Sequence, residues 1–169
     1  MKYDGDGIQV DKSEAAHYFK MAVDKGNIHA MYKYGLMLYY GESIPVNKQE
    51  AARYYKMAAD NGHEQSMYRY ARMLDDGDGI PVNKQEAARY YKMAADKGYE
   101  SSMHNYAVML DEGDGIPQDK QEAARYYKMA ADKGYKQSNH IYACMLFNGD
   151  GIPVDKQEAA RYFKIAADK

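Results

Sequence analysis

His140 and Cys144 are the residues of this sequence whose types and spacing come closest to a reactive site. They lie four positions apart, which places both on one face of a helix, and His104 lies 36 residues before His140. Imidazole and thiolate groups in this arrangement could hold zinc or copper, or form a cysteine–histidine nucleophile. No fourth ligand or orienting group accompanies them. Metal binding and hydrolase activity at these residues are therefore minor alternatives, and we expect no metal, no cofactor and no catalytic residue.

The loop at residues 76–79, Asp-Gly-Asp-Gly, is a second candidate because it resembles the start of a calcium-binding loop. Ile80 stands where a third oxygen ligand is needed, and Ala87 stands at the twelfth position in place of glutamate. The glycines and the proline that follows favour a turn. The loop also lacks the third glycine and the preceding strand of a nucleotide-binding motif, so we do not expect an enzyme.

A repeat organises the chain. Close copies of residues 47–62 begin, at a spacing of 36 residues, at Asp11, Asn83, Asp119 and Asp155. A fixed period of this length is typical of a solenoid, in which one unit is stacked several times and buries its apolar face against its neighbours. The sequence therefore predicts an all-α, α/α solenoid built from antiparallel helix pairs.

Two helices are expected in each unit. The first, which we call helix A, is represented by residues 63–75, where the helical period groups Ser66, Met67, Tyr70, Met73 and Leu74. The second, helix B, begins after Asn47, which forms a predicted capping box with Glu50, and ends at Gly62. Its period gathers on one packing face Ala51, Ala52, Tyr55, Ala58 and Ala59.

These units divide the chain into one continuous solenoid domain. We expect the end of a truncated repeat and an orphan helix B in residues 1–26, followed by repeats at 27–62, 63–98, 99–134 and 135–169. On this interpretation the sequence is a fragment. The last helix B repeats the internal sequence, so we expect Ala159, Tyr162 and Ala166 to be uncovered and to favour end-to-end self-association.

The repeat resembles the Sel-like repeat (SLR) family, a relative of the tetratricopeptide repeat. The resemblance rests on Gly-x-Gly-Ile in the loop and on Lys-x-x-Ala-x-x-aromatic-Tyr-x-x-Ala-Ala-x-x-Gly in helix B. It implies a right-handed superhelix whose concave side is lined by the A helices, and a role as a protein-binding scaffold. The family's glycine in helix A is kept only as Gly35, and its tryptophan in helix B is replaced by tyrosines such as Tyr54. Cys144 is the only cysteine, so members with paired cysteines are not close models.

Helix B hardly changes from copy to copy, whereas helix A varies at particular positions. On a helical wheel these positions lie opposite the packing face, and the SLR resemblance places them on the concave side. Merely solvated positions would vary too, but they would seldom carry large apolar residues. We call this candidate binding surface the A-helix face; it comprises Tyr32, Leu36, Tyr39, Tyr40, Tyr68, Arg72, Asp75, Asp76, His104, Val108, Asp111, Glu112, His140 and Phe147.

Composition limits the partners. The net charge is -2, with 23 basic and 25 acidic residues, so no basic field would attract nucleic acid or an anionic membrane. No apolar run is long enough for a membrane span, and one cysteine forms no internal disulfide, so we expect a cytoplasmic protein.

The remaining partner is a protein or peptide. Aromatic residues toward one end of the A-helix face and acids such as Asp75 and Asp111 at its middle favour a peptide with a basic centre and an apolar end. The alternative is a structural spacer or self-associating array without a ligand.

Overall fold

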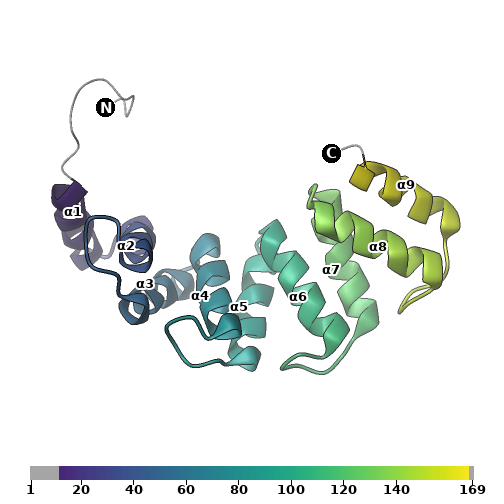
Figure 1. Cartoon of the computed structure of the whole chain (residues 1–169), viewed down its shortest axis with the longest axis horizontal. Coiled ribbons are helices and arrows are strands. Elements are labelled where there is room, and N and C mark those ends of the chain that lie inside the picture. The colour runs from purple at the N-terminus through teal and green to yellow at the C-terminus, as the bar shows by residue number, and fades with distance from the viewer. Residues whose placement is uncertain (1–11, 168–169) are drawn as a thin grey trace, which may run out of the picture.

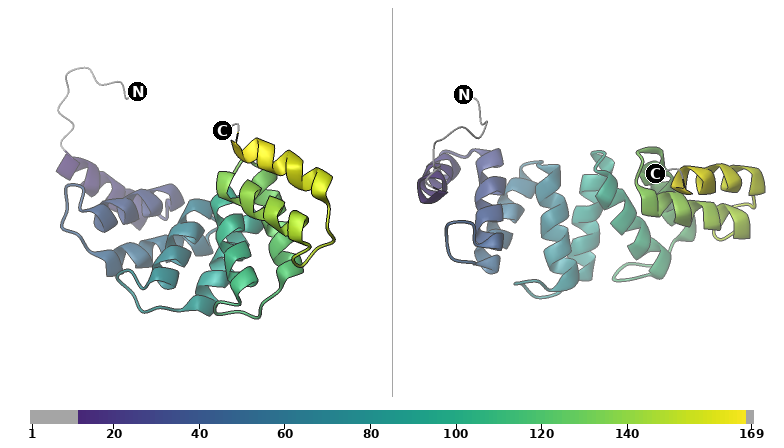
Figure 2. Two further views of the ribbon diagram at one scale, coloured as in Figure 1. Left: turned by 45° about the vertical axis from the view of Figure 1, so that its right-hand side comes forward. Right: turned by 45° about the horizontal axis from the view of Figure 1, so that its top comes forward.

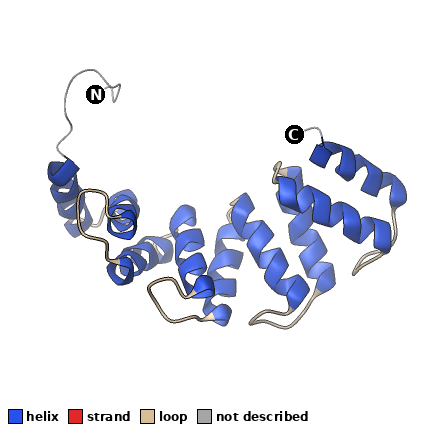
Figure 3. Ribbon diagram, viewed as in Figure 1, coloured by secondary structure: helices blue, strands red, loops and turns tan. Residues whose placement is uncertain are grey.

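The computed structural model describes residues 12–167, and within them the chain forms nine helices and no strand (Figure 3). The predicted all-α fold is confirmed. The expected cap at Asp11 and the expected end of a truncated repeat in residues 1–11 lie outside the described residues. The helices are α1 (Lys12–Asp24), α2 (Ile28–Tyr40), α3 (Lys48–Asp60), α4 (Glu64–Asp76), α5 (Lys84–Asp96), α6 (Glu100–Glu112), α7 (Lys120–Asp132), α8 (Lys136–Asn148) and α9 (Lys156–Ala167).

The helices follow one another along an arc whose two ends turn toward the same side (Figure 1). The even-numbered helices are the predicted A helices and the odd-numbered ones are the predicted B helices. Each helix packs mainly against the helix before it and the helix after it, and two further views show the same succession (Figure 2). This one-dimensional packing is that of a solenoid.

Helix B begins where its capping residue predicts. The Asn47 side chain accepts a hydrogen bond from the Glu50 backbone N–H at 3.0 Å, as an N-cap does. The return contact differs from a capping box, because the Asn47 backbone N–H donates to the Leu38 carbonyl at 2.8 Å. The Glu50 carboxylate instead accepts from the Asn47 side-chain amide at 3.4 Å. The N-cap therefore also joins helix B to helix A of the same repeat.

Helix B ends at the expected glycine. Gly62 adopts a φ of +91°, its N–H donates to the Ala59 carbonyl, and the N–H of His63 donates to the Ala58 carbonyl. This is the Schellman pattern, which satisfies the last carbonyls of the helix and turns the chain into the next repeat.

The predicted packing faces of both helices are buried, and one further residue of helix B joins them. Tyr54 is buried beside Tyr55, because its ring packs edge-on against Tyr34 of α2 with centroids 5.1 Å apart. The same edge-on contact recurs in the pairs Tyr70–Tyr90, Tyr106–Tyr126 and Tyr142–Tyr162. Tyrosine thus fills, in every described unit, the position where the SLR resemblance implies tryptophan.

The expected exposure of the last helix B is wrong for two of its three residues. Ala159 is fully buried and Tyr162 is 1% exposed, because both face α8 of their own repeat. The Tyr162 hydroxyl also donates to Asp132 of α7 at 2.7 Å. Of the three, only Ala166 is partly exposed, and two further alanines of this helix, Ala160 and Ala167, are exposed. The argument for self-association through Tyr162 and Ala159 therefore loses its basis.

The Asp-Gly-Asp-Gly loop holds adjacent repeats together. The Asp78 carboxylate accepts hydrogen bonds from Lys48 of α3, in the preceding repeat, and from Tyr39 of α2. Gly79, at a φ of +80°, lies so close to α3 that an added Cβ would stand 2.3 Å from the Lys48 Cβ. Equivalent ion pairs join Lys84 to Asp114 at 2.8 Å and Lys120 to Asp150 at 2.7 Å. The acidic residue that suggested calcium therefore binds a lysine side chain.

Candidate functional site

The predicted A-helix face is distributed over α2, α4, α6 and α8, and its residues differ in exposure. The exposed members are Tyr40, Arg72, Asp76, Glu112, His140 and Phe147. The half-buried members are Tyr32, Leu36, Tyr39, Tyr68, Asp75, His104, Val108 and Asp111. No member is fully buried, so each can be reached at least in part from solvent.

One row of half-buried rings packs between repeats. Tyr32 of α2 lies 4.8 Å, centroid to centroid, from the ring of His63, which precedes α4. The same contact recurs between Tyr68 and Tyr99 at 5.3 Å, and between His104 and Tyr135 at 4.8 Å. Tyr32, Tyr68 and His104 therefore help to join neighbouring repeats, and only their outer edges are available to a ligand.

Two of the four acids at the middle of the face, Asp75 and Asp76, are paired within the chain. Asp75 accepts a hydrogen bond from Lys84 of α5 at 2.7 Å and a longer one from Tyr91 at 3.4 Å. Asp76 lies 3.5 Å from the guanidinium of Arg72 on its own helix. Because Asp75 and Asp76 already have cationic partners, the expected attraction of a basic peptide centre rests on Asp111, which is half-buried, and on Glu112, which is exposed.

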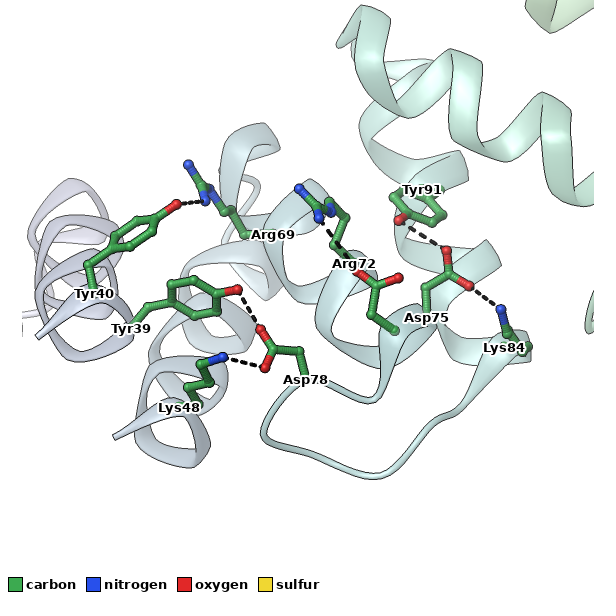
Figure 4. Close-up of polar contacts among 10 residues, drawn as sticks. Tyr39, Tyr40, Lys48, Arg69, Arg72, Asp75, Asp78, Lys84 and Tyr91 are labelled. Atoms are coloured by element: carbon green, nitrogen blue, oxygen red, sulfur yellow. Dashed lines mark hydrogen bonds and ion pairs between the residues drawn. The ribbon is translucent and has the colours of Figure 1, made fainter. Parts of the chain in front are cut away.

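Tyr39 and Tyr40 have different roles although they are adjacent. The Tyr39 hydroxyl donates to Asp78, and this contact, together with burial, raises the pKa of the phenol. Tyr40 is 54% exposed, and its hydroxyl accepts a hydrogen bond at 2.8 Å from Arg69 of α4 (Figure 4). Tyr39 is thus part of a tie between repeats, whereas Tyr40 presents its ring to solvent.

Arg69 is a site residue that sequence reasoning missed. It lies half-buried on α4, and Figure 4 shows its guanidinium projecting from the helix in the same direction as that of Arg72. The signal was present in the sequence, because the equivalent positions hold Lys33, Asn105 and Ile141 and therefore vary as much as the positions that were selected.

A small cavity of about 20 Å³ opens beside these arginines. Its lining comprises Tyr39, Tyr55, Arg69, Arg72, Met73, Asp76 and Asp78. The Tyr55 hydroxyl is buried and has no hydrogen-bond partner, and burial raises the pKa of this phenol. Tyr55 was assigned to the core from its helical position, which is correct; its place in the lining of this cavity was not foreseen.

His104, His140 and Cys144 do not form one site. His140 Nε2 lies 3.7 Å from Cys144 Sγ, and the His140 ring packs on Phe163 of α9. His104 Nδ1 instead lies 2.9 Å from Ser138 Oγ, and burial lowers the pKa of this imidazole. Within residues 12–167, no three His, Cys, Asp or Glu side chains gather as a metal site requires. The geometry therefore does not support the alternative that joined these three residues in one site.

None of the helices between residues 12 and 167 combines the length and the apolar character needed to cross a membrane.

Comparison with known proteins identifies the repeat. The family model described as "Sel1 repeat" matches residues 1–27, 28–63, 64–99, 100–135 and 137–169. No curated protein matches the chain.

Solved structures agree with the family match. A protective antigen of uropathogenic Escherichia coli displaying an SLR fold superposes with a TM-score of 0.89 at 28% identity, over 92% of this chain and 33% of the antigen. A Sel1 repeat protein from Oxalobacter formigenes gives 0.87 at 28% identity, over 92% of this chain and 64% of its own. Cysteine rich protein B of Helicobacter pylori, at 0.57 and 21% identity over 73% of this chain and 90% of its own, shares the fold. The chain thus spans about a third of the first of these proteins and under two thirds of the second.

Proposed function

The chain belongs to the Sel1 repeat family, and on that premise we propose that it is a non-catalytic scaffold whose A-helix face binds a peptide or a protein segment. Solenoids of this family generally serve as protein-interaction scaffolds. A row of stacked units offers an extended surface on which each repeat can contribute different side chains.

One observation carries the proposal: the A helices differ in sequence from repeat to repeat, and some of the side chains that differ are exposed aromatic rings. Helix B has the same sequence in α3, α5 and α7, and its alanines and tyrosines are buried, whereas its methionine is partly exposed or, as Met93, exposed. The A helices differ from each other, and they expose Tyr40 and Phe147, which are 54% and 49% exposed. Exposed aromatic rings next to charged groups are typical of interface residues that contribute most of the binding energy. We therefore expect Tyr40 and Phe147 to anchor the partner.

A peptide selection tests this proposal. Peptides from a displayed random library are selected on the immobilised chain, and their dissociation constants are measured for the wild type and two double variants. Replacing both anchors, Tyr40→Ala with Phe147→Ala, should weaken binding by about tenfold or more, because loss of a buried aromatic contact typically costs about 2 kcal/mol. The matched control, Arg53→Ala with Arg89→Ala, changes exposed residues of α3 and α5 and should leave binding unchanged.

Three results would contradict the proposal. Enrichment of no peptide would favour the spacer alternative. Equal binding by the wild type and the Tyr40/Phe147 variant would remove the A-helix face from the site, and weakened binding by the Arg53/Arg89 variant would move the site to the B helices.

A further inference from the structure

The cavity beside α4 contains a buried polar group that no residue of the chain satisfies. Tyr55 is fully buried, yet its hydroxyl makes no hydrogen bond. A buried hydroxyl without a partner is costly, and such groups in folded proteins require an explanation. Tyr55 lines a cavity of about 20 Å³, which has room for one water-sized atom group.

Arg69 adds a positive charge to this cavity that no carboxylate balances. Its guanidinium is half-buried, and its contacts are with Tyr40, as a donor to the hydroxyl and as a cation 5.7 Å from the ring centroid. A guanidinium is always charged and presents several donors that fit a carboxylate in a two-point contact. With only a phenol as its hydrogen-bond partner, Arg69 retains donors for a ligand.

The other charges around the cavity are matched. Asp78 accepts hydrogen bonds from Lys48 and Tyr39, and Arg72 lies 3.5 Å from Asp76. Because these groups balance each other, the excess charge is the single positive charge of Arg69. One excess positive charge suits a monoanion better than a dianion.

This arrangement occurs once among the described repeats. In the next repeat Asn105 replaces Arg69, and the hydroxyl of Tyr91, the equivalent of Tyr55, donates to Asp75 at 3.4 Å. Val108 replaces Arg72 there. One repeat later, Ile141 and Cys144 occupy the two arginine positions, and the tyrosine equivalent to Tyr55 is Tyr127. Within residues 12–167, Tyr55 is the tyrosine whose hydroxyl is buried without a partner, and it is also the one followed by arginine at both positions.

We propose that the cavity lined by Arg69, Arg72 and Tyr55 binds a carboxylate of the partner peptide, either its C-terminus or an Asp or Glu side chain. One carboxylate oxygen enters the cavity and accepts from Tyr55, and the other accepts from the outward donors of Arg69 and Arg72. The inference rests on the proposed function and specifies the chemistry of one subsite on the A-helix face. That subsite adjoins Tyr40, so the acidic group of the peptide lies beside its aromatic contact.

Small carboxylates test the subsite directly. The arginine Nε–Hε signals of the ¹⁵N-labelled chain are followed during titration with N-acetylglycine, which carries a terminal carboxylate, and with N-acetylaspartate methylamide, which carries a side-chain carboxylate. N-acetylglycinamide is the neutral control. Saturable shifts are expected for the Arg69 and Arg72 signals with both carboxylates, in the millimolar range because one small group makes few contacts. Arg53, exposed on α3, is the internal reference.

Single substitutions show which side chains contact the carboxylate, and the new residues are ones that other repeats carry at the equivalent positions. Arg69→Asn copies position 105 and should abolish the titration. Tyr55→Phe removes only the hydroxyl and should weaken N-acetylglycine binding about three- to tenfold, the range expected for one hydrogen bond. Tyr91→Phe removes the equivalent hydroxyl one repeat later and should leave the affinity unchanged. Because Tyr55→Phe keeps the ring, it tests the subsite even if Arg69→Asn disturbs folding.

The two carboxylates also distinguish the sources, since the tighter binder indicates whether a C-terminus or a side chain is preferred. The proposal is overturned if neither carboxylate gives a saturable shift, if Arg53 shifts as much as Arg69, or if Tyr55→Phe binds as the wild type does. Tighter binding of inorganic phosphate than of N-acetylglycine would likewise overturn the assignment to a carboxylate.

Its failure is separable from failure of the proposed function. If the carboxylates do not bind but selected peptides still depend on Tyr40 and Phe147, only the subsite is wrong. If the carboxylates bind but no peptide depends on the A-helix face, the subsite stands and the scaffold function fails.

Discussion

Tyr90 and Tyr55, two fully buried tyrosines at neighbouring positions of the B-helix repeat, differ in what their hydroxyl groups contact. Tyr90 of α5 donates to Asp60 and accepts from Lys56 at 3.0 Å, both on α3. Tyr55 of α3 has no such partner. A paired buried hydroxyl contributes to stability, whereas an unpaired one opposes it.

This difference predicts opposite results for the same substitution. Tyr90→Phe should lower the free energy of unfolding by about 1 kcal/mol or more, because it removes two hydrogen bonds and leaves Asp60 and Lys56 without this partner. Tyr55→Phe should leave it unchanged or raise it slightly. Urea unfolding followed by circular dichroism measures both, and equal losses in the two variants would contradict the structure.

His104 makes stability depend on pH. Burial lowers its pKa below the ordinary value, so the fold favours the neutral imidazole. The ring is enclosed by Tyr127, Tyr135 and Ser138. As pH falls below about 6.5, the unfolded chain takes up this proton before the folded one does, and stability that is present at higher pH is lost.

The substitution His104→Tyr should therefore reduce the loss of stability between neutral and mildly acidic pH. Tyrosine is the residue at the equivalent position, Tyr68, where it packs on Tyr99 in the same way as His104 packs on Tyr135. Thermal unfolding measured across this pH range tests the expectation. An unchanged pH dependence in His104→Tyr would show that this imidazole is not the titrating group.

At the scale of the elements, the loop between helix A and helix B fixes how one repeat sits on the preceding one. Lys48 reaches Asp78 across the repeat boundary, and Gly79 rests against the backbone and Cβ of the same lysine. On the other side of the stack, tyrosine hydroxyls of one B helix donate to aspartates of the previous one, as Tyr126 does to Asp96 at 2.8 Å. Both ties join residues 30 positions apart, so they set the spacing of neighbouring units.

Gly79→Ala should be more harmful than a glycine substitution at the end of a helix. Alanine at a positive φ costs about 1–2 kcal/mol at either position. At Gly79 its Cβ would in addition collide with Lys48, whereas at Gly62 the nearest atom is the mobile Lys97 Nζ at 3.6 Å. We therefore expect Gly79→Ala to cost at least about 1 kcal/mol more than Gly62→Ala in chemical denaturation. Equal costs would mean that the loop moves away from α3 without loss.

At the scale of the whole molecule, each helix packs mainly against the helices before and after it, so stability against local unfolding should vary along the arc. α9 buries Ala159 and Tyr162 against α8. α1 is less well covered, because Tyr18, the equivalent of Tyr162, is 59% exposed. In a linear array, local opening follows the contacts that each helix makes.

Amide hydrogen exchange should therefore be fastest in α1, intermediate in α9 and slowest in α4 to α6. Mass spectrometry of peptides covering each helix measures this order. Uniform exchange would show that the array unfolds as one cooperative unit, and faster exchange in α9 than in α1 would contradict the packing seen around Tyr162.

The sequence by itself determined the repeat, the alternation of two helices, their ends and their packing faces. These features are local: a period of 36 residues, an Asn47 that caps its own helix, and a Gly62 that ends it all act within a few residues of the chain. Helical periodicity also separated the invariant core from the variable A-helix face, whose use in binding stays a prediction.

Only the tertiary structure decided which groups are already engaged. Asp75 is paired with Lys84, Asp78 is paired with Lys48 from the preceding repeat, and Tyr162 is covered by α8. These contacts join different helices, within one repeat for Asp75 and Tyr162 and between repeats for Asp78. They depend on how the helices pack against each other, and a helical wheel, which describes a single helix, contains no such information. For the same reason the unsatisfied Tyr55 hydroxyl beside Arg69 is visible only in the folded arc.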